Sequence, residues 1–109
     1  MESLHAFLTE QTALCKERAA ALTADERADE AVFEKIRANV YEIFTAVLST
    51  ARKQPEPTDF FRRQLTAIPA NWEAALQKAR ANGDDARAHT ELLKLETVRA
   101  IRQRMEETV

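Results

Sequence analysis

The scarcity of residues that interrupt helices constrains this chain more than any other feature. Its 109 residues include one glycine, Gly83, and three prolines, Pro55, Pro57 and Pro69. In a helix interior, glycine and proline are less favourable than alanine by about 1 and 3 kcal/mol respectively. The alternation of apolar and polar residues that a half-buried strand needs never extends beyond a few residues. The sequence therefore predicts an all-α fold.

Apolar residues at helical spacing predict a first helix over about residues 2–22. Leu4, Leu8 and other apolar residues share one face of this helix. Gln11 and Arg18 interrupt the face, and we expect both at a partly solvated edge. The alternative is a polar pair that sets helix register or the choice of partner, as buried polar residues do in coiled coils.

A second helix is predicted over about residues 24–53. Thr23 to Glu26 have the form of a capping box, in which the threonine hydroxyl and the glutamate each accept an unpaired amide at the helix start. The apolar residues of this helix cover about 160° of the helical wheel, wider than the stripe of about 100° typical of a surface helix. We therefore expect it to contact two neighbours.

Two further helices are predicted over about residues 59–82 and 85–107, after a linker at residues 54–57. The apolar stripe of the third helix continues through Pro69, which should kink or split it. Gly83 is placed to end it, and Asp84 or Asp85 to begin the fourth. Short connections between long helices favour antiparallel neighbours. Residues 1–109 are thus expected to form one domain, an antiparallel four-helix bundle with up-down-up-down order.

Charge and composition exclude several classes of protein. The formal net charge is −2, so no basic excess attracts a polyanion. No apolar run approaches the roughly 18 residues of a membrane span, and the N-terminus lacks the pattern of a signal peptide. A single cysteine cannot form an internal disulfide. We therefore expect a cytoplasmic protein.

The sequence does not place residues of the types used in catalysis or metal binding close together in a set large enough to form a site. Glu2 with His5, and Asp85 with His89, have metal-ligand spacing, but neither pair has further ligands nearby. Cys15 lies on the apolar face of the first helix, where a buried thiol is inert. We expect no enzymatic activity, no catalytic residues, no cofactor and no functional metal site.

Apolar residues outside the main stripes favour a protein-interaction function, with a homodimer as the simplest assembly. Phe60 and Leu93 lie off the faces of their helices, and Trp72 is either a core residue or an interface anchor. These three residues form the predicted interface.

Two alternative functions remain open at this point. One is a small-molecule or metal binder with a pocket near Tyr41, Trp72 or His89. The other is a nucleic-acid-binding protein that uses Arg99, Arg102 and Arg104, although acidic residues lie between these arginines.

Part of the chain resembles a known repeat. Trp72, Gly83 with Asp84, and then Ala88 and Leu92 stand where a single tetratricopeptide hairpin has its bulky first residue, its turn and the start of its second helix. Residues 72–100 therefore resemble one such hairpin. Leu76 and Leu95 replace the small residues of that repeat, and no second copy follows, so neither a solenoid nor a peptide-binding groove is implied. The whole chain resembles small helical bacterial families of unknown function.

Overall fold

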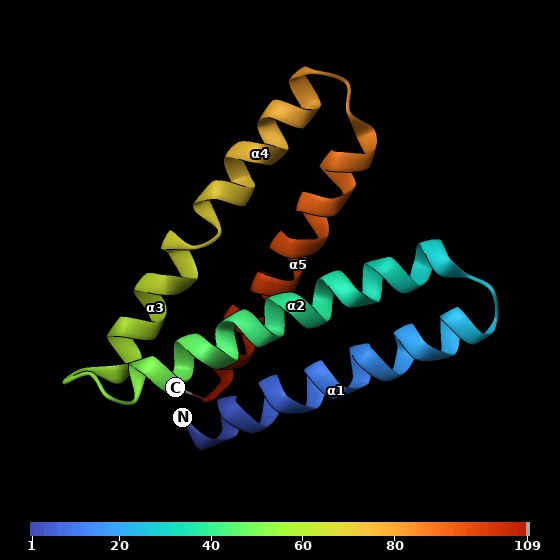
Figure 1. Cartoon of the computed structure of the whole chain (residues 1–109). Helices are drawn as coiled ribbons and strands as arrows, with labels where there is room; N and C mark the ends of the chain where they lie inside the picture. Colours follow the sequence, from blue (N-terminus) through green and yellow to red (C-terminus); the bar gives the residue numbers. More distant parts are fainter. Residues whose placement is uncertain (109) are drawn as a thin grey trace.

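A computed structural model describes residues 1–108 of the chain, with side chains up to Glu107. Within this part every regular element is an α-helix (Figure 1). The five helices are α1 (Glu2–Ala24), α2 (Ala28–Ala51), α3 (Pro57–Ala67), α4 (Ala70–Ala81) and α5 (Asp85–Thr108). The all-α prediction is confirmed, and α3 and α4 together correspond to the third predicted helix.

The helices are arranged as two antiparallel hairpins that meet at one end of the molecule (Figure 1). We call the α1–α2 hairpin the first arm and the α4–α5 hairpin the second arm; α3 joins them. The N-terminus, the last turn of α5 and α3 lie where the arms meet, whereas the turns at residues 25–27 and 82–84 lie far apart. The fold is an antiparallel helical bundle, as predicted, but the second hairpin crosses the first instead of lying alongside it.

The core lies where the two arms meet. Phe44 of α2 and Phe61 of α3 are fully buried, with ring centroids 6.1 Å apart in an edge-to-face arrangement. Leu8 of α1 and Ile101 of α5 pack into the same core. Because α2 contacts α1, α3 and α5, the wide apolar face predicted for the second helix is confirmed.

The first helix continues through the residues predicted to begin the second. The hydroxyl of Thr23 donates to the carbonyl of Ala19 at 2.9 Å, inside α1. The chain turns at Glu26, whose φ is 61°. The N–H groups of Glu26 and Arg27 donate to the carbonyls of Thr23 and Leu22 at 3.1 and 2.8 Å, which is the Schellman helix ending. The capping-box prediction is wrong, because the alanine-rich residues 19–24 favour helix.

The turn of the second arm has the same backbone geometry. Gly83 has a φ of 68°, and the N–H groups of Gly83 and Asp84 donate to the carbonyls of Arg80 and Ala79 at 3.2 and 2.8 Å. Oδ1 of Asp84 accepts the N–H of Arg87 at 3.1 Å and so caps α5. Both predicted roles, Gly83 as helix end and Asp84 as helix start, are confirmed.

Pro69 splits the third predicted helix into α3 and α4. Proline has no N–H, so the carbonyl of Leu65, four residues earlier, loses its helical donor. Arg102 of α5 replaces that donor: its Nη2 donates to the Leu65 carbonyl at 2.6 Å. The break is therefore satisfied by a side chain from the opposite helix of the bundle.

Candidate interaction surface

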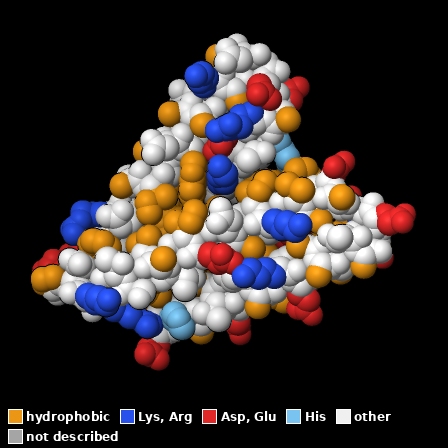
Figure 2. All heavy atoms as spheres, viewed as in Figure 1, with side chains coloured by type: hydrophobic (Ala, Val, Ile, Leu, Met, Phe, Trp, Pro, Cys, Tyr) orange, Lys and Arg blue, Asp and Glu red, His pale blue; other side chains and the backbone are white. Residues whose placement is uncertain are grey.

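One face of α2 borders the angle between the two arms. Val32, Ile36, Asn39, Ile43 and Val47 recur at steps of four, three, four and four, and so share one side of the helix. We call these five residues the α2 seam. Val32 is 50% exposed, Asn39 is exposed, and the other three are half-buried. Figure 2 shows apolar side chains gathered between α2 and α4. The chain's own helices thus leave this face partly uncovered.

A hollow of about 270 Å³ lies at the end of the seam where the arms meet. Ala46, Val47 and Thr50 of α2 line one side of it, and Phe60 and Gln64 of α3 line the other. Its lining is mostly apolar, so the hollow suits an aliphatic side chain better than a charged ligand.

The three residues predicted as an interface have different positions. Phe60 is half-buried and lines the hollow. Trp72 is half-buried against the core, with Nζ of Lys94 5.6 Å from its ring centroid. Leu93 is 3% exposed, so the prediction that it is an outlier available to a partner is wrong. The reason is that α5 packs against both α4 and α2, which buries residues outside its main stripe.

A buried carboxylate in the second arm was not found by sequence reasoning. The side chain of Glu91 is 1% exposed, and its Oε1 accepts from Nε of Arg87 at 2.9 Å and from Nζ of Lys94 at 3.3 Å. Basic residues four before and three after a glutamate lie next to it on a helix surface. The sequence contains many pairs of opposite charge at such spacings, and most of them are expected to be exposed to solvent. Only the packing of α5 between two helices distinguishes this one.

Cys15 is buried, as predicted, and its surroundings keep the thiol protonated. Burial raises the pKa of Cys15, and the neighbouring Glu34 carboxylate raises it further. Nη1 of Arg37 donates to Glu34 at 2.6 Å. Burial also raises the pKa of Tyr41. A thiol with a raised pKa contains little thiolate near neutral pH and is a poor nucleophile.

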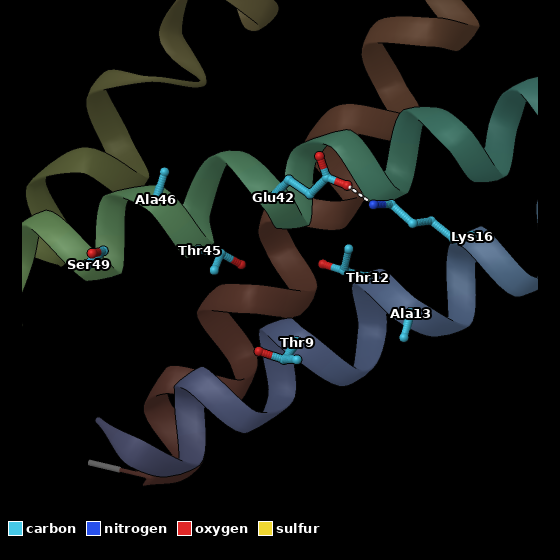
Figure 3. A pocket seen from close by; sticks show the side chains of 8 residues that line it. All are labelled: Thr9, Thr12, Ala13, Lys16, Glu42, Thr45, Ala46 and Ser49. Atoms are coloured by element: carbon cyan, nitrogen blue, oxygen red, sulfur yellow. Dashed lines mark ion pairs between the residues drawn. The ribbon is translucent and has the colours of Figure 1, made fainter.

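A second depression, of about 630 Å³, lies between the helices of the first arm (Figure 3). Lys16 and Glu42 form an ion pair across it at 2.6 Å. The hydroxyls of Thr12 and Thr45 donate to carbonyls of their own helices, each at 2.8 Å. The remaining lining residues are small: Thr9, Ala13, Ala46 and Ser49. These small side chains make the depression wide, and nothing in it selects a ligand.

The three arginines considered for nucleic-acid binding do not act as one group. Arg102 bonds the Leu65 carbonyl. Arg104 lies over the Phe7 ring, 5.2 Å from its centroid, and Arg99 is exposed. Phosphate binding depends on several cations that converge on the backbone. Because two of the three are engaged within the chain, the geometry does not favour this alternative.

The two sequence pairs with metal-ligand spacing gain no further ligands. Among the residues that the structure describes, no group of three or more histidine, cysteine, aspartate or glutamate side chains could hold a metal ion. His5 is exposed, and the ring of His89 packs edge-on against Phe33 with centroids 4.7 Å apart. His89 is therefore a packing residue of α5 against α2.

Comparison with protein-family models, with curated proteins and with solved structures returned no match. In residues 1–108, none of the helices combines the length and the apolar character needed to cross a membrane.

Proposed function

We propose that this chain is a non-catalytic protein-interaction domain that associates with itself through the angle between its arms. The observation that carries the proposal is the partly uncovered α2 seam. Val32 at one end of it is 50% exposed, and the hollow lined by Phe60 lies at its other end. Apolar residues scattered singly on a surface need no explanation, whereas apolar residues that share one helix face beside an apolar hollow are typical of interaction sites.

The polar groups of the core support an interaction role over a catalytic one. Glu91 is held by two cations of its own helix, and Cys15 is buried with a raised pKa. General acid–base and nucleophilic catalysis need such groups within reach of a substrate. Here they are directed into the bundle.

Sedimentation equilibrium over a range of concentrations tests self-association. Val32→Glu introduces a carboxylate into the seam, whereas Leu14→Glu is a matched control. Leu14 is 39% exposed and lies on α1, on the far side of α2 from the angle (Figure 1). We expect the wild type and Leu14→Glu to dimerise, and Val32→Glu to weaken the dimer at least tenfold. A wild type that stays monomeric at high concentration would contradict the proposal, as would unimpaired dimerisation of Val32→Glu.

A further inference from the structure

The α2 seam is complementary to itself when two copies of α2 run in opposite directions. If Val32 of one copy lies opposite Val47 of the other, Ile36 lies opposite Ile43, and Asn39 lies next to the two-fold axis. We propose that two copies of this chain pair in this register, α2 against α2, so that each seam covers the other. The inference rests on the self-association proposed above and specifies its geometry.

The hollow at the end of the seam accommodates the most exposed side chain of the same seam. Among the residues whose side chains the structure describes, Val32 is the most exposed large apolar one, at 50%. In the proposed register it enters the hollow of the second copy, between Val47 and Thr50 of α2 and Phe60 of α3. Two-fold symmetry fills both hollows at once. A projecting side chain and a hollow at matching positions are complementary in the same sense as the knobs and holes of paired helices, with α3 adding a wall to the hollow here.

The charges at the two ends of α2 favour antiparallel over parallel pairing. The turn before α2 and its first residues carry four acids and one base: Asp25, Glu26, Asp29, Glu30 and Arg27. Two bases, Arg52 and Lys53, follow its last residue. Antiparallel pairing places the acidic end of each α2 beside the basic end of the other and opposes the helix dipoles. Parallel pairing would place acid beside acid.

A second charge match lies closer to the two-fold axis. Lys35 and Glu42 are both exposed and lie on the same side of the seam, two turns apart. In the proposed register, Lys35 of each copy lies within one turn of Glu42 of the other. Glu42 already accepts Lys16 of its own chain at 2.6 Å, so its carboxylate is held at the surface. The symmetric contact is closed, which limits the assembly to a dimer.

Disulfide cross-linking tests the register. Asn39→Cys places a thiol next to the two-fold axis, and Ser49→Cys places one at another exposed position, in the depression of the first arm. Wild type, whose Cys15 is buried, measures the background. Under mild oxidation we expect at least tenfold more covalent dimer from Asn39→Cys than from Ser49→Cys. A yield no higher than the control overturns the register.

Charge reversal provides a second, independent test. Lys35→Glu and Glu42→Lys each place like charges together twice per dimer, and we expect each to weaken dimerisation about tenfold. An equimolar mixture of the two variants pairs opposite charges again and should dimerise as tightly as wild type. If wild type dimerises but the mixture does not recover, the register is wrong and the proposed self-association stands. If wild type is monomeric at every concentration, both proposals fail.

Discussion

At the scale of single residues, Glu91 shows how one carboxylate is tolerated inside the second arm. Its side chain is 1% exposed, and Arg87 and Lys94 both donate to the same oxygen, Oε1. The other oxygen, Oε2, is buried without a hydrogen-bond partner. Removing a charge from water costs several kcal/mol, which nearby cations and hydrogen bonds offset in part. The ion pair of Glu91 with Arg87 thus has a defined geometry but adds little to the free energy of unfolding, because the Arg87 side chain remains largely exposed to water.

We expect Glu91→Ala to lower the free energy of unfolding by about 2 kcal/mol, since it leaves Lys94 half-buried without its anion. Glu91→Gln, which keeps an acceptor, should cost about half as much. Urea denaturation measures both. Glu96→Ala, at an exposed position of the same helix, is the control and should change stability little. Equal effects at the two positions would show that Glu91 has no structural role.

At the scale of helices, the two arms turn through the same Schellman geometry with different residues. Glu26 has a φ of 61° and Gly83 one of 68°, and only glycine adopts this region without cost. We expect Glu26→Gly to stabilise the protein by about 0.5–1 kcal/mol, and Gly83→Ala to destabilise it by about 1 kcal/mol. Apart from its chain neighbours, nothing lies within 4 Å of the place that a Cβ of residue 83 would occupy, so the cost there is conformational. Thermal unfolding of the two variants checks this, and effects of the same sign would refute it.

The break at Pro69 provides an interaction that a double-mutant cycle can isolate. Arg102→Met leaves the Leu65 carbonyl without the donor that lies at 2.6 Å, which should cost about 1–2 kcal/mol. In a Pro69→Ala background the new N–H can donate to the same carbonyl, so Arg102→Met should cost about 1 kcal/mol less. Chemical denaturation of the four proteins measures the coupling. Strictly additive costs would mean that Arg102 stabilises the bundle in another way.

Helices and their breaks could be predicted from the sequence where a single residue determines the backbone. The burial of a side chain could not be predicted where its helix packs against two others. Pro69 and Gly83 act through their own backbones, so their effects follow from the sequence. Thr23 fits a capping box and a helix interior equally well, and the alanines before it decide the outcome. Leu93 and Glu91 became buried because α5 packs between α4 and α2, and one helical stripe contains no information about a second contact. Phe60 could be singled out from the sequence because it lies off the stripe of its helix, but the hollow beside it depends on the crossing of the arms, and its place in an interface stays a prediction.

At the scale of the whole molecule, the two arms share most of their buried core at one end, and the rings of Phe33 and His89 form a further contact between them nearer the turns. The residues that hold them together, among them Phe44, Phe61 and Ile101, lie at that shared end. The two most extensive helix–helix contacts, α1 with α2 and α4 with α5, lie within the arms. Such an arrangement predicts that local opening needs less free energy at the far ends of the arms than at the junction.

Native-state hydrogen exchange can test this division. Phe61→Ala removes a fully buried ring from the junction and should cost about 3–5 kcal/mol, so it should lower protection in both arms together. Leu76→Ala, in α4 and away from the junction, should lower protection in α4 and α5 and leave the amides of α1 and α2 nearly unchanged. The wild type itself should show less protection near residues 20–30 and 80–88 than near the middle of α2. If Leu76→Ala lowered protection in the first arm as much as in the second, the arms would unfold as one unit. Their junction would then not be the element that sets the stability of the molecule.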